Sequence, residues 1–348
     1  MKEIKKKKIC LIGLGSIGVT HLTHINKLFD NIIIVDFNSE AIGVARKNLG
    51  VKKFTYLSSI REIKDNLEID FAVISNWGPD HFKTFQFLQN LGIKNYIIEK
   101  PITDSVAELQ RINQIRLENN LRIFINFQWS FSPLIDNISK IREKSKVGRI
   151  VGINVYGGCK CIATNGIHYL DLANLLFQAN PIEVFSSYYD SGINPRNKDF
   201  LFLGGSATWK YSENRYFNIS FSNNSRISAS MEIMFEHGIG KIIGDKLEIS
   251  SIDKKKLETF KSRTKTLYPS EIVYNGRAFT NLDDTDGLHL IYQKFTDKNF
   301  VKDNFEHSYR STMDFFGSLI SSDRNSAIKL PLKVYKFSKD HRRRWGIS

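Results

Sequence analysis

Short apolar runs alternate with amphipathic stretches through the first third of the chain. A short apolar run bounded by turn residues is typical of a buried strand, and an amphipathic stretch is typical of a covering helix. Their alternation indicates βαβ units and a parallel sheet. Six strands are predicted, at Ile9–Ile12, Asn31–Val35, Lys53–Tyr56, Phe71–Ser75, Tyr96–Ile98 and Arg122–Asn126. Helices fit between them, and Asp104 is the predicted N-cap of the helix that runs to about Asn119.

The pattern changes after Pro133. A predicted helix at Leu134–Lys146 leads to a strand at Ile150–Tyr156, and a short helix is expected to begin near Asn165. Five strand-like runs follow, at Glu183–Tyr188, Ser206–Tyr211, Tyr216–Ser220, Ile227–Phe235 and Lys241–Ile249, before a final helix from about Asn304 to Ile320. Strands clustered in this way indicate a largely antiparallel sheet. We therefore predict an α/β chain with a doubly wound parallel sheet in residues 1–126 and an α+β domain with an open sheet in residues 127–348.

A glycine-rich motif, Gly13-x-Gly15-x-x-Gly18, directly follows the first predicted strand and opens a helix. In that context the pattern predicts a Rossmann dinucleotide site, with the pyrophosphate on the loop and on the helix N-terminus at Ser16 and Ile17. Asp36 ends the second strand, where an acidic residue binds the ribose hydroxyls. A carboxylate repels a 2′-phosphate and no arginine follows it, so NAD is favoured over NADP. The alternative is a glycine-rich turn that binds no ligand.

The loop after the fourth strand is expected to line the same crevice, because ligands bind beyond the carboxyl ends of the strands. Asn76 and Trp77 are predicted to lie against the ribose and the nicotinamide. His81 belongs to this cofactor loop, where we interpret it as capping or packing at the start of the next helix rather than as performing chemistry.

Glu99-Lys100-Pro101 closes the fifth strand and places an ammonium group where the cofactor would lie. Such a group can donate a hydrogen bond or a proton to a reacting oxygen. Proline beside it fixes φ and allows a cis bond. Glu99 is assigned with the cofactor-binding residues. The alternative for Lys100 is a solvated lysine at a strand end.

Together these motifs resemble the Gfo/Idh/MocA oxidoreductase family, which includes glucose-fructose oxidoreductase and inositol dehydrogenase. The resemblance also rests on Asn126-Phe127-Gln128 and on Gly166-Ile167-His168-Tyr169-Leu170-Asp171, and it covers nearly the whole chain. It implies a Rossmann domain, a second domain that binds substrate and forms oligomers, and hydride transfer at a sugar carbon. It also implies that Lys100 polarises the reacting oxygen while His168 exchanges its proton.

Two positions depart from the family pattern. Many members carry an aspartate four residues before the histidine, where this chain has Thr164, which cannot act as a carboxylate base. We interpret Thr164 as a helix N-cap or as the residue before an Asn165 cap. Trp129 stands where many relatives place a basic residue, so stacking replaces charge near the substrate. Asp171, at i+3 from His168, either orients the imidazole or has a structural role.

The composition is that of an ordinary globular protein and does not indicate one that binds nucleic acid. Hydrophobic content of 41% and charged content of 25% are ordinary for a globular protein. The net charge of +14 comes from runs such as Lys5–Lys8, Lys254–Lys256 and Arg342–Arg344. No nucleic-acid-binding motif accompanies these runs, so we interpret the charge as a bias of a chain rich in Lys, Ile and Asn.

The three cysteines, Cys10, Cys159 and Cys161, suggest neither disulfides nor a metal site. No targeting sequence and no run of about 18 apolar residues is evident, so we expect a cytoplasmic protein that does not bind membranes.

The sequence therefore predicts an NAD-dependent dehydrogenase or reductase acting on a sugar or a nucleotide-linked sugar, such as one used in surface-glycan synthesis, and assembled as a homodimer or homotetramer. One alternative is an NAD-binding regulatory protein of the same fold. Another is a sugar hydrolase or epimerase that recycles NAD.

Overall fold

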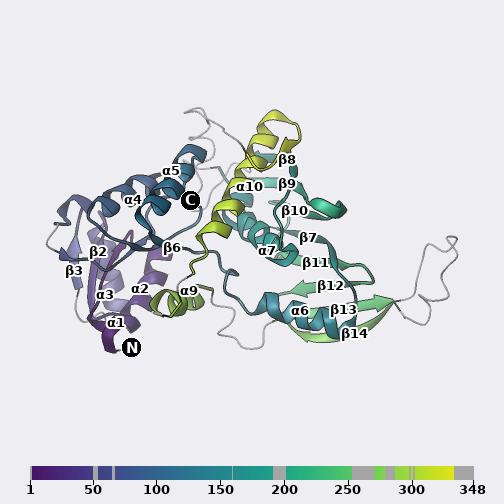
Figure 1. Cartoon of the computed structure of the whole chain (residues 1–348), viewed down its shortest axis with the longest axis horizontal. Coiled ribbons are helices and arrows are strands. Elements are labelled where there is room, and N and C mark those ends of the chain that lie inside the picture. Colours follow the sequence, from purple (N-terminus) through teal and green to yellow (C-terminus); the bar gives the residue numbers. More distant parts are fainter. Residues whose placement is uncertain are drawn as a thin grey trace. The chain divides into compact units, whose positions relative to one another are not determined.

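The computed structural model describes residues 2–49, 54–64, 67–158, 160–190, 201–252, 270–278, 287–297, 299–300 and 302–332. Cys159, Lys254–Lys256 and Arg342–Arg344 lie outside these residues. The chain forms two compact units (Figure 1). Apart from residues that are not described, the first consists of Met1–Gln128 and Gly287–Thr312, and the second of Trp129–Asp286 and Met313–Lys333.

The first unit is built on a six-stranded sheet in the order β3-β2-β1-β4-β5-β6, with every pair of neighbours parallel. This is the strand order of a doubly wound nucleotide-binding sheet. The strands are β1 (Lys8–Ile12), β2 (Asn31–Val35), β3 (Phe54–Leu57), β4 (Phe71–Ile74), β5 (Asn95–Ile98) and β6 (Arg122–Ile125). The helices are α1 (Lys2–Lys6), α2 (Ser16–Leu28), α3 (Ser39–Leu49), α4 (His81–Asn90), α5 (Val106–Asn119) and α9 (Gly287–Thr296).

Central strands of this sheet are continuous apolar runs because both of their faces are buried. All four residues of β4 are buried, as are Ile9–Ile12 of β1. The strand order reverses between β1 and β4, which leaves a crevice beyond their carboxyl ends. The loops that follow β1, β2, β4 and β5 therefore share one edge of the sheet.

Helix α9 packs with the first unit although it is remote in sequence. Its buried residues include Tyr292 and Phe295, and Phe295 makes edge contacts with Phe71 and Phe124 of the sheet. The expected division after residue 126 assigns residues 287–312 to the second domain, whereas the structure packs them with the first unit because this apolar face completes its core.

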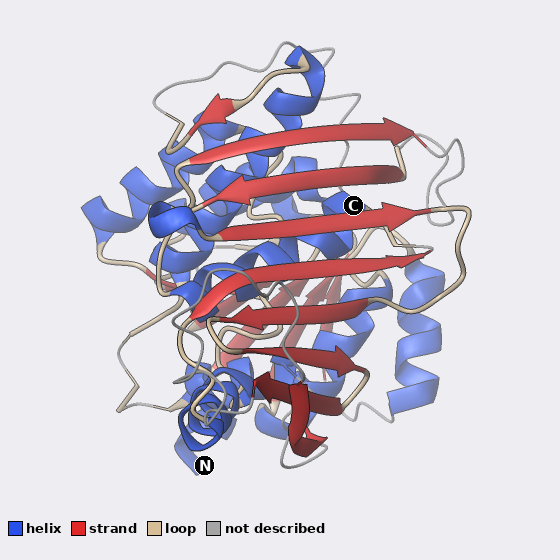
Figure 2. Ribbon diagram, turned by 90° about the vertical axis from the view of Figure 1, so that its right-hand side faces the viewer, coloured by secondary structure: helices blue, strands red, loops and turns tan. Residues whose placement is uncertain are grey.

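The second unit contains a nine-stranded sheet in the order β14-β13-β12-β11-β7-β10-β9-β8-β15, which Figure 2 shows nearly face on. Only the β7–β10 pair is parallel in this part of the described chain. The strands are β7 (Ile150–Gly158), β8 (Glu183–Asp190), β9 (Leu203–Lys210), β10 (Tyr216–Ser222), β11 (Ser230–Phe235), β12 (Gly238–Ile243), β13 (Lys246–Ile252), β14 (Ser270–Arg277) and β15 (Ile328–Lys329). The helices are α6 (Leu134–Ser145), α7 (Ile167–Phe177) and the larger part of α10 (Phe305–Arg324), which begins in the first unit.

The predicted fold class is confirmed, with a parallel Rossmann sheet and a second, mostly antiparallel sheet. Three local predictions are wrong. Ser105, and not Asp104, is the N-cap of α5, since its side chain accepts from the amide of Glu108. The predicted strand at 241–249 is a hairpin of β12 and β13 that turns at Gly244, where φ is +62°. Residues 227–229 precede β11 rather than belonging to it.

Candidate functional site

The glycine-rich loop after β1 owes its shape to two close approaches between backbone segments. A Cβ on Gly13, whose φ is +90°, would lie 2.6 Å from the Cα of Asn76, and one on Gly18 would lie 2.2 Å from the Gly13 carbonyl oxygen. Ser75 fixes the loop from below, since its hydroxyl donates to the carbonyl oxygens of Ile12 and Gly13. Only glycine fits at these two positions.

Gly15 has the opposite environment. A Cβ there would meet no atom within 4 Å, so the third glycine leaves open space at the start of α2. Gly15 is the N-cap and makes no side-chain capping bond, Ser16 and Ile17 are exposed, and the first turn of α2 carries no acidic residue. Free amide groups and the helix dipole at such an end favour an anion. The loop therefore fits the pyrophosphate of a dinucleotide.

Asp36 joins the loops after β1 and β2. One carboxylate oxygen accepts from the amide of Leu14 at 2.5 Å, and the other accepts from the amide of Asn38 at 2.7 Å. The Tyr56 hydroxyl donates to the Asp36 carbonyl oxygen. Asp36 is half-buried, while the next residue, Phe37, is 91% exposed. These bonds fix a carboxylate beside the glycine loop, where it can accept from ribose hydroxyls.

Hydrogen bonds from buried side chains hold the loop that follows β4. The Asn76 side-chain amide donates to the Thr84 hydroxyl at 2.9 Å. The ring nitrogens of His81 lie 3.0 Å from the carbonyl oxygens of Asn76 and Pro101, and burial lowers the pKa of the His81 imidazole. His81 thus ties this loop to the one after β5. Trp77 differs from these residues because 44% of its surface is exposed.

Glu99 and Lys100 directly follow β5 at the same edge of the sheet. Glu99 is 5% exposed, and Lys100 is half-buried with a cis bond to Pro101. The Glu99 carboxylate accepts from the Asn126 amide at 2.6 Å and lies 2.8 Å from Nε2 of His21. The first unit therefore brings together every residue predicted there, from Gly13 to Lys100.

In the second unit, His168 lies in the first turn of α7 beside aromatic rings. The Trp129 ring lies 6.3 Å from the His168 ring in an edge arrangement and 5.0 Å from the ring of Tyr169. Tyr169 in turn meets Phe221 edge-on at 6.1 Å, and burial raises the pKa of the Tyr169 phenol. Trp129, His168 and Tyr169 are all partly exposed, so a half-open aromatic surface adjoins the imidazole.

Thr164 and Asn165 do not cap α7, which corrects the predicted role. They lie in a π-helical turn at Ile162–Gly166, and α7 begins only at Ile167. The Asn165 side-chain oxygen accepts from the Cys161 amide at 3.3 Å and from the Thr164 hydroxyl at 3.4 Å. The turn is therefore closed by its own side chains, and π-helical turns are frequent at functional sites.

Asp171 is fully buried on α7, one turn beyond His168. Burial raises the pKa of Tyr211, and the nearby carboxylates of Asp314 and Asp171 raise it further. The Tyr211 hydroxyl donates to Asn174, whose amide donates to Asp314 at 3.3 Å. Asp171 therefore belongs to a cluster of buried polar side chains on the inner side of α7.

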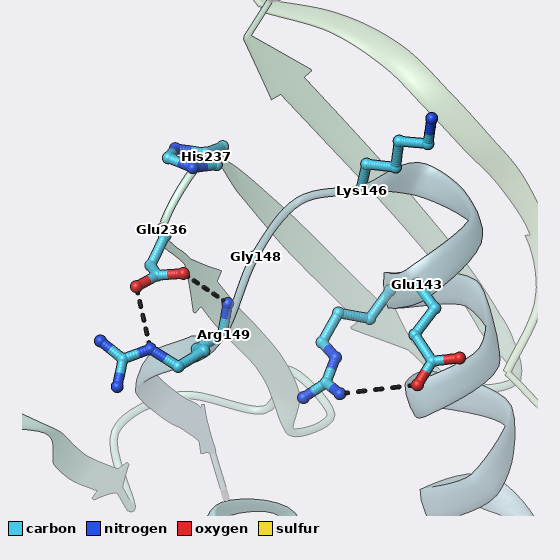
Figure 3. Close-up of a pocket in the computed structure, with 7 residues that line it drawn as sticks. Glu143, Lys146, Gly148, Arg149, Glu236 and His237 are labelled. Atoms are coloured by element: carbon cyan, nitrogen blue, oxygen red, sulfur yellow. Dashed lines mark hydrogen bonds and ion pairs between the residues drawn. The ribbon is translucent and has the colours of Figure 1, made fainter.

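A separate hollow of about 470 Å³ opens on the second unit (Figure 3). Its lining is Arg142, Glu143, Lys146, Gly148, Arg149, Glu236 and His237. The Glu236 carboxylate accepts from both the amide and Nε of Arg149 at 2.9 Å, which clips the turn at Gly148, where φ is +87°. None of the predicted site residues lines this hollow, and its paired charges hold a turn.

The sequence analysis did not identify two residues that contact the site in the first unit. His21 faces Glu99 from α2, and Tyr292 on α9 places its hydroxyl 3.0 Å from Nδ1 of His21. His21 had a signal, because it follows Gly18 by one turn and shares the inner side of α2. Tyr292 had none, since nothing local to residue 292 links it to the glycine loop.

Searches for other kinds of site gave two further observations. The described residues contain no group of three or more His, Cys, Asp or Glu side chains arranged to hold a metal ion. None of the helices in the described ranges combines the length and apolarity needed to cross a bilayer.

Comparison with solved structures identifies the fold. An oxidoreductase from Agrobacterium radiobacter in complex with NAD+, L-tartaric acid and magnesium has a TM-score of 0.72 at 13% identity, over 93% of this chain and 98% of that one. UDP-N-acetylglucosamine 3-dehydrogenase from Acidithiobacillus ferrooxidans has a TM-score of 0.68 at 15% identity, over 91% and 97%. A super-repressor mutant of Gal80p from Saccharomyces cerevisiae has a TM-score of 0.67 at 13% identity, over 93% and 97%.

Sequence comparison identifies the family. Curated protein sequences give no match. Residues 7–127 match the model of the GFO_IDH_MocA family, described as an oxidoreductase family with an NAD-binding Rossmann fold. The resemblance drawn from the motifs is thereby confirmed. Residues 7–127, the Rossmann domain of this chain, thus belong to the Gfo/Idh/MocA family of oxidoreductases.

Proposed function

We propose that this protein is an NAD-dependent oxidoreductase that transfers a hydride between nicotinamide and a carbon of a sugar or nucleotide-linked sugar. The observation that carries the proposal is the position of Lys100. It follows β5 at the sheet edge that also holds the glycine loop after β1 and Asp36 after β2. An ammonium group at the crevice of a dinucleotide-binding sheet is placed for work on a reacting oxygen rather than for packing.

The cofactor preference follows from Asp36. Its carboxylate is fixed by two amides and would accept from the ribose 2′-hydroxyl, whereas a 2′-phosphate would bring a second negative charge against it. The next residues, Phe37 and Asn38, provide no cation to offset that repulsion. NAD is therefore the proposed cofactor, and it supplies the hydride acceptor or donor when bound.

Lys100 is proposed to bind and polarise the reacting oxygen. Burial raises the pKa of the neighbouring Glu99 carboxyl, but the hydrogen bond with His21 and the charge of Lys100 lower it by more, so that a carboxylate stands next to Lys100. A charged amine can donate a hydrogen bond to an alkoxide or a carbonyl oxygen and so stabilise the charge that develops there.

His168 is proposed to exchange the proton of the same hydroxyl, and the residues near it in the second unit suit a sugar. The Trp129 and Tyr169 rings beside it offer an apolar platform for the ring hydrogens of a sugar. Thr164 and Asn165 offer polar groups for its hydroxyls. Asp171 is proposed to orient the His168 imidazole, with a purely structural role as its alternative.

The experiment begins with the purified protein and a search for co-purified nicotinamide by its NADH absorbance band. A panel of sugars, sugar acids and nucleotide sugars is then screened for NADH formation. Lys100→Ala should abolish turnover and leave the affinity for NADH largely unchanged. Full activity in that variant would eliminate the proposed role of Lys100.

A second candidate is an NAD-binding regulatory protein that has lost turnover. Two observations favour it. Thr164 replaces a carboxylate that many family members carry, and a protein described as a repressor shares the fold. Retention of both Lys100 and His168 favours the enzyme, since a regulator has no chemical need of them. NADH binding without turnover on the whole panel would favour the regulator, while release of a sugar product without net NADH would favour the NAD-recycling alternative.

Assembly as a homodimer or homotetramer is proposed from the open sheet. Tyr156, Tyr216 and Met234 lie on one face of neighbouring strands β7, β10 and β11, and each is more than 40% exposed. Large apolar side chains on a sheet face are typical of a surface that another chain covers. The mass in solution, measured by light scattering, should be at least twice 40.1 kDa. A location in the cytoplasm stays a prediction.

A further inference from the structure

Among the described strands of the second unit, only β7 and β10 pair in parallel, so both end at the same edge of the sheet. Ser222, the last residue of β10, pairs with Gly158, the last residue of β7. Beyond β7 the chain passes through Lys160 into the π-helical turn and then into α7, which carries His168. Beyond β10 it forms a loop, residues 223–229, that leads to β11. The two segments therefore leave the sheet side by side.

The loop after β10 lies in direct backbone contact with the end of β7. The Gly158 amide donates to the Ile227 carbonyl oxygen at 2.8 Å, and a Cβ on Gly158 would lie 1.9 Å from the Ser225 carbonyl oxygen. Only glycine permits so close an approach. Arg226 stands between the two loop residues that meet Gly158, and Lys160 follows Gly158 by two positions. The contact therefore places two cationic residues on adjoining segments.

The two segments that meet here carry cations and no acidic residue. Neither residues 150–170 nor residues 216–231 include an aspartate or a glutamate. Within the part of the chain that the structure describes, the side chains of Lys160 and Arg226 form no ion pair and no hydrogen bond. Arg226 is exposed and Lys160 is partly exposed. Cations without a local counter-charge attract an anion.

Two carboxylates lie farther along the same edge of the sheet, and each has a partner of its own. Asp190 ends β8 and accepts from the Phe202 amide at 3.3 Å. Asp245 lies in the turn between β12 and β13 and pairs with Arg277 at 3.6 Å. Neither belongs to the segments that follow β7 and β10.

The loop after β10 also adjoins the aromatic surface beside His168. Phe221, the last residue but one of β10, meets the Tyr169 ring edge-on at 6.1 Å. The Tyr169 ring lies 5.0 Å from the ring of Trp129, which in turn lies 6.3 Å from the His168 ring. One continuous row of rings thus leads from His168 to the start of the loop that carries a cation.

We propose that Lys160 and Arg226 form an anion subsite beside this aromatic surface, and that the substrate is a sugar with an anionic group. That group is either the diphosphate of a nucleotide-linked sugar or the carboxylate of a sugar acid. The inference deepens the proposed function, on which it rests for the presence of a sugar at His168. It also gives a reason for two local features: the subsite supplies the charge that Trp129 lacks, and the neutral Thr164 adds no repulsion against an anion.

The test measures binding and requires no turnover. The probes are uridine diphosphate and glucuronate, each compared with its uncharged counterpart, uridine or glucose, by isothermal titration calorimetry on the intact chain. At least one of the two anions should bind at least about tenfold more tightly than its counterpart, and which one does so identifies the anionic group. Titrations repeated with NADH present detect a diphosphate that binds the glycine loop instead, because NADH would compete with it there.

Removal of either cation should weaken binding of the preferred anion. Lys160→Gln and Arg226→Gln should each raise its Kd about tenfold, because a hydrogen bond to a charged group is lost, and should leave the Kd of the uncharged counterpart unchanged. Arg226→Lys retains the charge and should lose less. Lys210→Gln is the matched control, since Lys210 is an exposed lysine that pairs with Tyr216 at the opposite end of β10. Its Kd values should equal those of the wild type.

Equal affinities for each anion and its uncharged counterpart would overturn the proposal. So would anion binding that is unchanged in the Lys160 and Arg226 variants, or that is weakened equally in the Lys210 variant. These outcomes differ from failure of the proposed function. Anion binding that requires both cations, in a protein without turnover on the whole panel, would retain the subsite and reject the oxidoreductase. Turnover of a neutral sugar that is unchanged in both glutamine variants would do the reverse.

Discussion

The glycine loop permits a paired prediction, because two of its glycines have opposite surroundings. A Cβ at Gly18 would lie 2.2 Å from the Gly13 carbonyl oxygen, short by 0.8 Å of the 3.0 Å below which real Cβ contacts are essentially never found. The obstructing atom is backbone, held by the Ser75 hydroxyl, and cannot rotate away. At Gly15 the same methyl group would meet nothing within 4 Å.

The magnitudes follow from these distances. Overpacking of this kind costs about 3 kcal/mol when the neighbour is rigid, so Gly18→Ala should lose about that much free energy of unfolding. For a domain of this size the loss corresponds to a fall in Tm of roughly 6–12 °C. Gly15→Ala should change stability by less than about 1 kcal/mol, because alanine is only a poorer N-cap than glycine. Its methyl group would instead occupy space proposed for the pyrophosphate, and the Kd for NADH should rise at least about tenfold, which is 1.4 kcal/mol.

Urea denaturation followed by circular dichroism measures the first quantity, and NADH fluorescence titration measures the second. Gly15→Ala with unchanged affinity for NADH would refute the placement of the cofactor on this loop. Gly18→Ala as stable as the wild type would refute the steric reasoning, whatever its affinity.

Three further predictions concern charged groups of the first unit. Asp36→Ala removes the carboxylate that opposes a 2′-phosphate, so the ratio of NADPH to NADH affinity should rise about tenfold in paired fluorescence titrations; an unchanged ratio would contradict the assigned role. The folded-state pKa of Glu99 lies below its ordinary 4.5, so its contribution to stability is present above that value and is lost as pH falls below it. Wild-type stability should thus decline more steeply in acid than that of Glu99→Gln, and parallel declines would contradict the pKa direction. Arg122→Lys should lower the free energy of unfolding, measured in urea, by about 2 kcal/mol. The Arg122 guanidinium donates to the carbonyl oxygens of Lys294, Phe295 and Phe300, and an ammonium group cannot make all three bonds with the same geometry. A loss below about 0.5 kcal/mol would contradict this reasoning.

The sequence predicted most of the first unit because its strands are buried on both faces. Such strands are uninterrupted apolar runs, and the predicted β1 and β2 differ from the structure by at most one residue. The second sheet was less predictable. Gly244 and Asp245 turn the chain between β12 and β13 within one apolar stretch, so a tight hairpin resembled a single strand. Strand β14 is mostly exposed, and an edge strand of this kind has little apolar alternation to detect.

The site shows the same division between local and distant information. The glycine loop, Asp36 and Lys100 are set by motifs within a few residues of themselves, so sequence located them. The contact between His21 and Tyr292 spans 271 residues and depends on α9 packing beside α2, which no local pattern encodes. The N-cap of α5 was predicted as Asp104 and is Ser105 for another reason. Either side chain can cap a helix, and only the backbone geometry decides which of the two does so.

The central claim is that Lys100 serves hydride transfer on a sugar with NAD as cofactor. The most direct measurement compares NADH formation by the wild type and Lys100→Ala, with NAD+ and the same sugar and nucleotide-sugar panel, after NADH titration of both proteins. We predict turnover by the wild type with at least one of these substrates, and its loss in the variant at a Kd for NADH changed by less than about threefold, or 0.7 kcal/mol. Equal turnover in the two proteins, or no NADH binding by either, would contradict the account.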